Sequence, residues 1–572
     1  MPDPKLWGLP LFIFTLALGL RLLGIGWGLP NAVHQESYHP DEPLVWSKSQ
    51  AIEPTKLDFT PGFYNYGTLY LTTLKIASDV VAGYTGGGPN PEKPDEVWSF
   101  IGKSHLAGRI ISALAGSGTA LLVFLILRRF SNELGAAFGG LAIVFAPAHV
   151  VHSRFQTVDI LAAFLIAASA FYALKLIPTE GIEEKRSDLK LAILSGVFAG
   201  LSAGTKYTGI LCLITLVVVA FGVRRQSWLK LSGIGIGIAA LVFLITTPGI
   251  LLETKAFMDG FFYETKHVKE GHGLIFEGTS SGFIFHIANL MLGLGTLMAL
   301  LGLGGLFGGA GKRHWWAIGL AAFLIPYYIL IAGAEVKFIR YTFPIFIGIA
   351  VGFGWLIGKS REKGGKWHMV VGLGILALGG LLGGGLQSSI RFTTWMASPD
   401  PREVVGAYLR GKDTTVGVVA DPWFYTPSFH PELGRRLVFE RGMPAVGMTG
   451  YSNYLDSRLQ AMASPKVERF APIGADGQRD LAQRLDWDDR LVTESKPEYV
   501  VFSSFESEGL ERIAQLSNPS PVGKATSDRA KAFMEKLKAD YVFDRQFGPD
   551  MDFIHDMLYV QPTVWVWKRK TP

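Results

Sequence analysis

Long apolar runs dominate the first two thirds of the chain and decide what it can fold into. A helix needs about 20 apolar residues to cross a bilayer core of about 30 Å. Hydrophobic residues make up 49% of the chain and charged residues only 18%, whereas soluble domains carry about 25% charged residues. We therefore predict a polytopic α-helical membrane protein. About eleven runs qualify as spans, namely residues 7–29, 106–127, 134–152, 159–177, 189–205, 207–222, 229–248, 284–307, 315–333, 338–357 and 369–387.

Charge and cysteine content exclude several other classes of protein. The net charge of +6 is modest, and basic residues beside membrane spans explain it without a nucleic-acid partner. The single cysteine, Cys212, rules out a disulfide framework or a cysteine metal site within one chain. The first apolar run is too long for a signal peptide and no small-residue cleavage site follows it, so we predict a retained span.

The basic residues of the short loops predict the orientation in the cell (plasma or inner) membrane. They fall on one side of the predicted spans, which should be the cytoplasm. The N-terminus is then cytoplasmic, and an odd number of spans places the C-terminal segment outside. The short runs 189–205 and 207–222 are the pair on which this parity depends. The basic residues used are Lys5, Arg128, Arg129, Lys185, Arg186, Arg224, Arg225, Lys312, Arg313 and the lysines and arginine of 359–366.

We predict two domains. Residues 1–389 form the membrane domain, which has a long first outer loop at 30–105. Residues 390–572 are more polar and alternate helix and strand signals, which predicts an extracytoplasmic α/β domain. Its expected strands are 415–420, 498–502, 541–543 and 563–568, and a helix is expected at 527–538.

The first outer loop holds the most suggestive group of polar residues. His39, Asp41 and Glu42 follow one another closely, and Pro40 and Pro43 are expected to deny this stretch a regular helix. A carboxylate held at the membrane surface can act as a general base toward an attacking hydroxyl. An ordinary solvated loop explains the same residues equally well from their spacing alone.

Other ionisable residues lie at the outer ends of later spans. Arg154 and Asp159 border a very short outer loop, Lys206 stands at the break between two short spans, and Arg340 lies at the edge of the tenth span. The common explanations are a basic side chain that reaches the headgroups and an acidic N-cap. Because these residues and Asp41 come from separate segments yet share one membrane surface, we interpret them as one site. A lipid phosphate would satisfy Arg340.

Six short motifs along the chain resemble, in their residues and in their order, those of GT-C class glycosyltransferases. The resemblance is closest to the protein O-mannosyltransferase and lipid A aminoarabinose transferase group, of the bacterial or archaeal type, and covers roughly residues 7–390. The segment 64–70 lacks the paired prolines often seen in that group, and there is no room for the inserted β-trefoil domains of eukaryotic members. The motifs are Arg21-Leu22-Leu23, His39-Pro40-Asp41-Glu42, Tyr64-Asn65-Tyr66-Gly67-Thr68-Leu69-Tyr70, Arg154 through Asp159, Lys206-Tyr207-Thr208-Gly209 and Arg340-Tyr341-Thr342-Phe343-Pro344.

The resemblance implies a polyprenyl-phosphate sugar donor, an acceptor protein, lipid or glycan outside the cytoplasm, and inversion at the anomeric carbon. It leaves cofactors open, including a divalent metal. The implied catalytic residues are Asp41 as the base, with Glu42 and Asp159 in the same cavity. The implied donor-phosphate ligands are Arg154, Lys206 and Arg340. The implied cavity residues are His39, Tyr66, Tyr207 and Tyr341.

Two other functions are alternatives to a sugar transferase. A transporter or flippase for a lipid-linked or anionic solute would favour repeats and charged groups near the midplane, whereas here the charged groups gather at the outer surface. A membrane-anchored binding protein would leave the loop carboxylates and the basic span ends unexplained. We therefore predict an integral-membrane glycosyltransferase.

Overall fold

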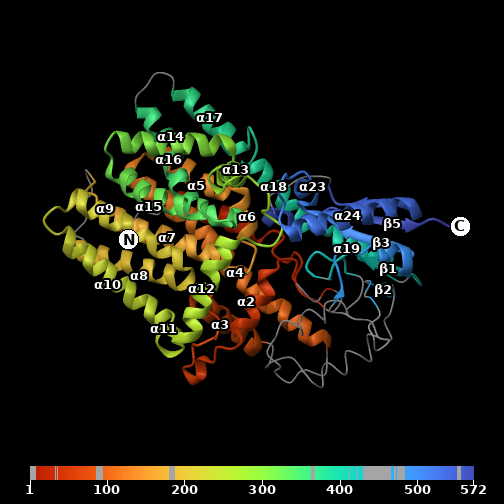
Figure 1. The fold of residues 1–572 in the computed structure, drawn as a ribbon. Helices are drawn as coiled ribbons and strands as arrows, with labels where there is room; N and C mark the ends of the chain where they lie inside the picture. Colours follow the sequence, from red (N-terminus) through yellow and green to blue (C-terminus); the bar gives the residue numbers. More distant parts are fainter. Residues whose placement is uncertain are drawn as a thin grey trace.

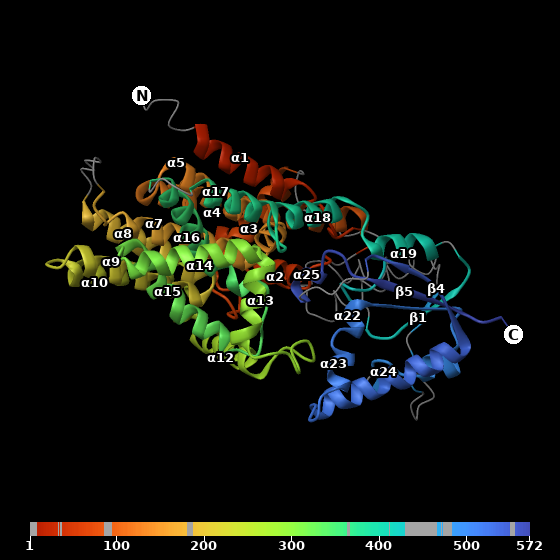
Figure 2. The same ribbon diagram turned by 90° about the horizontal axis from the view of Figure 1, so that it is seen from above.

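A large helical part and a smaller sheet-containing part lie side by side in the computed structural model (Figure 1). The structure describes residues 8–31, 34, 37–84, 94–179, 187–362, 367–410, 412–421, 423–428, 466–468, 470, 472, 483–549 and 555–571. Figure 2 shows that α2 and α25 lie where the two parts meet.

Apolar helices make up the larger part, and every predicted span coincides with at least one helix. Within the described ranges, four segments are long and apolar enough to cross a membrane, namely Ser99–Phe130, Trp228–Thr246, Trp315–Ala332 and Ile339–Arg361. The polytopic helical class is thereby confirmed. The helices in the predicted spans are α1 (Gly8–Leu22), α4 (Pro94–Phe130), α5 (Glu133–Val144), α6 (Pro147–His152), α7 (Val158–Leu174), α8 (Asp188–Thr205), η3 (Tyr207–Cys212), α9 (Leu213–Val223), α10 (Trp228–Thr246), α13 (Gly282–Leu294), α14 (Thr296–Gly311), α15 (Trp315–Ala332), η4 (Ile339–Thr342), α16 (Phe343–Glu362) and α17 (Trp367–Gly379).

Three predicted spans are interrupted rather than continuous. The span 134–152 breaks before Pro147, the first residue of α6, because proline cannot continue the preceding helix. The span 284–307 breaks at Gly295, whose φ of 123° lies outside the range of helices. The span 369–387 ends α17 and begins α18 (Gly385–Ala397), separated by a turn that contains several glycines with positive φ.

Five further helices come from residues 41–84 and 249–270, which lie outside the predicted spans. They are α2 (Asp41–Ser49), η2 (Pro54–Lys56), α3 (Leu69–Tyr84), α11 (Gly249–Leu252) and α12 (Thr254–Glu270). The expectation that Pro40 and Pro43 prevent a helix at 41–49 is wrong. Pro40 is the N-cap of α2 and Pro43 lies in its first turn, where a proline removes no intrahelical hydrogen bond.

The C-terminal part contains a mixed five-stranded sheet, which confirms the predicted α/β class. The strand order is β2-β1-β3-β5-β4, with β1 parallel to β2 and β3, and β5 antiparallel to β3 and β4. Apolar residues of α19 pack on one face of the sheet and those of α24 on the other. The bounds are β1 (Thr415–Val418), β2 (Lys466–Glu468), β3 (Tyr499–Ser503), β4 (Tyr541–Phe547), β5 (Val564–Arg569), α19 (Pro401–Leu409), η6 (Leu491–Ser495), α22 (Ser504–Ser507), α23 (Leu510–Ala514), α24 (Pro521–Asp540) and α25 (His555–Leu558).

The two parts share buried contacts. Phe424, Met557 and Tyr559 belong to the same apolar core cluster as the membrane helices. Trp27, just after α1, donates a hydrogen bond from its indole N–H to Asp400, 3.0 Å away. The C-terminal part is therefore packed against one end of the helical part.

Candidate active site

Four charged side chains from four segments meet at the end of the helical part that adjoins the C-terminal part. Arg340 Nη2 lies 3.1 Å from Asp41 Oδ2, and Arg340 Nε lies 3.8 Å from Asp159 Oδ2. Lys206 Nζ donates to Asp159 Oδ1 at 2.6 Å. The structure thus brings together one predicted base, one further predicted carboxylate and two predicted phosphate ligands.

Asp41 is the most accessible member of this cluster. Its side chain is 29% exposed, compared with 5% for Asp159 and 8% for Arg340. Asp41 begins α2 and Asp159 lies in the first turn of α7, so both carboxylates lie where the helix dipole favours a negative charge. Asp41 is therefore the carboxylate that a molecule entering from outside can reach.

His39 fixes the backbone next to Asp41. The imidazole is fully buried, and its Nδ1 accepts a hydrogen bond from the Asp41 backbone N–H at 3.2 Å. Burial lowers the pKa of His39 well below its usual value, although nearby Glu42 opposes this effect. The ring is neutral at pH 7 with its proton on Nε2, since Nδ1 is the acceptor.

The break between α8 and η3 sets the positions of Lys206 and Tyr207. Lys206 has extended backbone dihedrals between α8 and η3. The Tyr207 hydroxyl donates to the backbone carbonyls of Tyr64 and Tyr66 at 2.8 and 2.9 Å, which ties this break to the first outer loop. Gly67 permits the approach, because a Cβ there would lie 2.1 Å from the carbonyl oxygen of Gly204.

Aromatic rings accompany both cations. Lys206 Nζ lies 4.3 Å from the centre of the Tyr341 ring, and the Arg340 guanidinium lies 4.0 Å from the centre of the Phe338 ring. Cations so placed gain electrostatic stabilisation from the ring. Arg340 Nη1 is buried and has no hydrogen-bond partner among the residues that the structure describes. An anion at this position would satisfy it.

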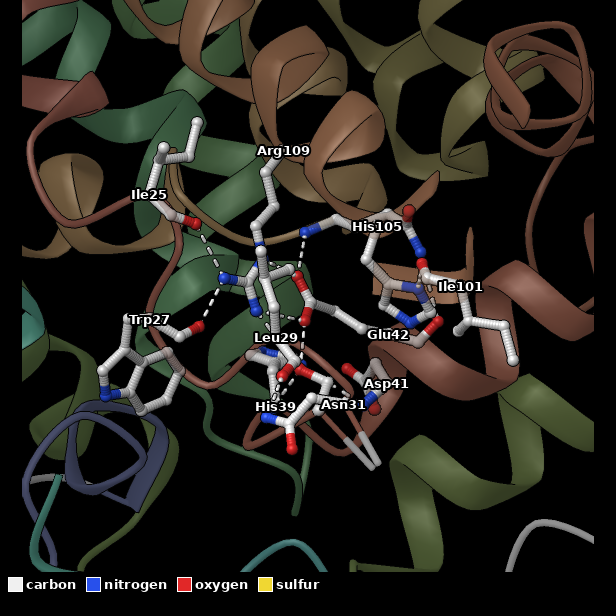
Figure 3. A network of polar contacts seen from close by, with 12 residues as sticks. Ile25, Trp27, Leu29, Asn31, His39, Asp41, Glu42, Ile101, His105 and Arg109 are labelled. Atoms are coloured by element: carbon white, nitrogen blue, oxygen red, sulfur yellow. Dashed lines mark hydrogen bonds and ion pairs between the residues drawn. The ribbon is translucent and has the colours of Figure 1, made fainter. Parts of the chain in front are cut away.

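Glu42 is turned away from this cluster into a buried ion pair with Arg109 of α4 (Figure 3). Arg109 Nε and Nη2 donate to the two carboxylate oxygens at 2.8 and 2.7 Å, and Nη1 donates to the carbonyl of Ile25 at 2.8 Å. The backbone N–H of Gln156 donates to Glu42 at 2.6 Å. Burial by itself would raise the pKa of Glu42, but Arg109 outweighs it and lowers the pKa to about 2.

Arg154 has partners elsewhere. Its Nη2 donates to the carbonyl of Leu20 and to the hydroxyl of Thr393, both at 2.6 Å. These contacts join α1 and α18 to the short loop before α7. The structure therefore does not place the guanidinium of Arg154 with Lys206 and Arg340.

Helix α12 adds a carboxylate that the sequence did not indicate. Glu264 is partly buried and lies within electrostatic reach of Lys206, Arg340 and Asp41. Burial raises the pKa of Glu264, although Lys206 opposes this effect. Within the described ranges, no group of three or more histidine, cysteine, aspartate or glutamate side chains could hold a metal ion.

Residues 97–251 match the model of a family described as dolichyl-phosphate-mannose-protein mannosyltransferase. These residues are therefore similar to a family of sugar transferases, in line with the resemblance that the motifs indicated. This match confirms the resemblance and the predicted enzyme class, a glycosyltransferase. No curated protein matches the chain.

The similar solved structures are themselves GT-C glycosyltransferases. ArnT from Cupriavidus metallidurans bound to undecaprenyl phosphate is 14% identical, with 98% of each chain covered and a TM-score of 0.47. The oligosaccharyltransferase AglB from Archaeoglobus fulgidus, with an inhibitory peptide and a dolichol-phosphate, is 12% identical over 94% of this chain and 72% of that chain, with a TM-score of 0.47. The S. cerevisiae Pmt1–Pmt2 complex is 17% identical over 50% of this chain and 36% of that chain, with a TM-score of 0.29. These scores are too low to transfer a function.

The sequence did not single out Arg109, Glu264 or Asp556. Asp556 is a carboxylate that accepts hydrogen bonds from the backbone N–H groups of Ile339 and Arg340. Arg109 offered a signal, since a charge inside the apolar run 106–127 requires a buried partner or a polar cavity. Nothing in the local sequence of Glu264 or Asp556 distinguishes either residue from ordinary surface carboxylates, because their position depends on how distant segments pack.

Proposed function

We propose that the protein transfers a sugar from a polyprenyl-phosphate donor to an acceptor on the outer side of the cell membrane, with Asp41 as the general base. The observation that carries this proposal is the meeting of Asp41 and Asp159 with Lys206 and Arg340 at one end of the helical part. The acceptor is a hydroxyl- or amino-bearing protein, lipid or glycan, and the C-terminal domain lies on the same outer side.

The two cations suit a phosphate leaving group. Arg340 Nη1 is buried without a hydrogen-bond partner in the part of the chain that the structure describes, and the Lys206 ammonium is 19% exposed. A guanidinium and an ammonium side by side stabilise the charge that develops on the phosphate oxygens as the sugar departs. A polyprenyl chain is apolar and requires apolar surroundings, which a bundle of membrane helices provides.

The chemical step uses one proton and one broken bond. The acceptor oxygen or nitrogen forms a bond to the anomeric carbon while the bond from that carbon to the phosphate oxygen breaks. Asp41 accepts the proton of the acceptor, and the polyprenyl phosphate leaves with the electron pair of the broken bond. Attack from the face opposite the leaving group inverts the anomeric carbon.

The other predicted site residues divide into two groups. Tyr66, Tyr207 and Tyr341 lie at the loop and helix ends that surround the cations, and His39 sets the backbone of Asp41. Glu42 and Arg154 are better suited to holding the site together, because their hydrogen bonds join α2 to α4 and α1 to α18. We assign neither of them a part in the chemistry.

The decisive experiment measures radiolabelled sugar transfer by purified protein in lipid from a panel of polyprenyl-phosphate sugars. Wild type should use at least one donor, and Asp41→Asn should lower turnover by about a hundredfold or more, which is the size of general-base catalysis. Asp58→Asn, an exposed carboxylate of the same loop, is the matched control and should behave as wild type. Near-normal turnover in Asp41→Asn would remove Asp41 from this role.

A further inference from the structure

A carboxylate of the C-terminal domain reaches the backbone that carries Arg340. Asp556 lies in α25, and its side chain is completely buried. Its Oδ1 accepts a hydrogen bond from the Ile339 N–H at 3.1 Å, and its Oδ2 accepts one from the Arg340 N–H at 3.2 Å. These N–H groups belong to the first two residues of η4, which runs directly into α16.

These two hydrogen bonds satisfy backbone N–H groups that have no partner within their own helix. The first N–H groups of a helical turn have no partner within the helix, and an ionised carboxylate is a strong acceptor for them. A second group also faces Asp556, since His152 Nε2 lies 3.8 Å from Asp556 Oδ2. A buried carboxylate without partners is strongly destabilising, so the placement of Asp556 here requires these partners.

Tyr559 approaches Arg340 from the same segment. Its buried hydroxyl lies close enough to Arg340 to interact with the guanidinium. Its ring is 4.8 Å from the ring of His39, the residue that sets the backbone of Asp41. The segment from Asp556 to Tyr559 thus contacts both the cation and the base side of the proposed site.

The C-terminal domain holds this segment firmly. The carbonyl of Tyr559 accepts a hydrogen bond from Arg402 Nη2 at 2.6 Å, and Arg402 is paired with Asp400 at 2.7 Å. At the other end of α25, the His555 imidazole is hydrogen bonded to Glu508. The position of Asp556 is therefore set by the fold of the C-terminal domain rather than by the membrane helices.

We propose that Asp556 is a positioning residue through which the C-terminal domain sets Arg340 for the donor phosphate, assisted by Tyr559. This inference rests on the proposed role of Arg340 as a phosphate ligand. The two domains then form one catalytic unit, because a group essential for donor binding is held by hydrogen bonds that cross from one domain to the other.

The test compares Asp556→Asn with wild type in the full chain in lipid. Asparagine keeps the shape, but its amide offers only one acceptor oxygen, so one N–H of η4 faces an NH₂ group. We expect the donor KM, and the Kd for polyprenyl phosphate itself, to rise by about tenfold or more, as when one strong hydrogen bond is lost. The acceptor KM should stay the same. Asp528→Asn, an exposed carboxylate of α24, is the matched control.

A merely structural role would lower the amount of active enzyme and leave the KM values unchanged, and that result would overturn the proposal. A second experiment measures whether the effects of Asp556 and Arg340 on binding depend on each other. In the Arg340→Ala background, Asp556→Asn should change the Kd for polyprenyl phosphate less than twofold, because it acts through Arg340. A full additional loss in that background would also refute the proposal.

A second variant covers a failure to fold, and the wild-type result separates this inference from the proposed function. Should Asp556→Asn not fold, Tyr559→Phe removes only a hydroxyl and is expected to raise the Kd for polyprenyl phosphate by a smaller factor, whereas an unchanged Kd in that variant counts against the proposal. If wild type transfers sugar while the donor KM of Asp556→Asn is normal, this inference fails and the proposed function stands. If wild type neither transfers sugar nor binds polyprenyl phosphate, both fail.

Discussion

Replacing Glu42 with glutamine should destabilise the protein rather than alter its chemistry. The side chain is completely buried, and both oxygens accept hydrogen bonds from the guanidinium of Arg109. Glutamine has nearly the same shape, but its NH₂ group would face the N–H groups of Arg109 and it carries no charge. The variant therefore leaves a buried cation without its counter-ion.

Two independent arguments give the same size for this loss. The pKa of Glu42 is lowered from 4.5 to about 2, which at 1.36 kcal/mol per pKa unit corresponds to about 3 kcal/mol. Breaking a buried ion pair by removing one partner costs about 3–5 kcal/mol. Because the pKa is lowered in the folded state, this stabilisation is present above pH 4.5 and is lost as the pH falls toward 2.

The assay is chemical unfolding of the purified protein in detergent, followed between pH 7 and pH 3. Glu42→Gln should lower the free energy of unfolding by about 3 kcal/mol at pH 7 and should lose less stability than wild type as the pH falls below 4.5. Glu53→Gln is the control, since Glu53 forms an exposed pair with Lys56 and should cost about 0–1 kcal/mol. A Glu42→Gln protein with wild-type stability and greatly reduced turnover would refute this reasoning and return Glu42 to the chemistry.

Three further predictions test the site and the topology. Arg340→Ala should raise the Kd for polyprenyl phosphate by about tenfold or more, with Arg340→Lys intermediate because it keeps the charge; an unchanged Kd would contradict the phosphate role. Gly67→Ala should lower the free energy of unfolding by about 1–3 kcal/mol, since its Cβ would meet the Gly204 carbonyl, whereas Gly83→Ala, with open space around it, should not. A protease added to intact cells, with any outer membrane opened, should cleave within residues 390–572, and protection there would refute the predicted orientation.

The meeting of Asp41, Asp159, Lys206 and Arg340 could be predicted from sequence because the membrane simplifies the geometry. Each residue lies at the end of a span on the same predicted side, so the bilayer already places all four in one plane. The remaining uncertainty was their lateral position in that plane. Helix packing, with α7 against α8 and α16 against α7, brings the four side chains within reach of one another.

The partners of buried charges could not be predicted in this way. Glu42 follows Asp41 directly, and nothing in the sequence says that one carboxylate faces the site while its neighbour pairs with Arg109, 67 residues away. The formation of α2 decides it, because adjacent residues of a helix point in different directions. From the sequence, Pro40 and Pro43 were expected to prevent a helix there. The different directions of the two carboxylates could therefore not be predicted.

Charge balance within the cluster supplies a reason for two carboxylates beside two cations. Asp159 contacts both Lys206 and Arg340, whereas Asp41 forms an ion pair with Arg340 alone among the residues that the structure describes. A donor phosphate bound to the two cations would compete with both carboxylates for them. Asp159, which is more deeply buried and faces two cations, would keep a partner, and the more exposed Asp41 would lose its own. A carboxylate released from its cation is free to accept a proton from the acceptor. In this arrangement, donor binding itself would prepare the base, which accounts for the ion pair between the predicted base Asp41 and the predicted phosphate ligand Arg340.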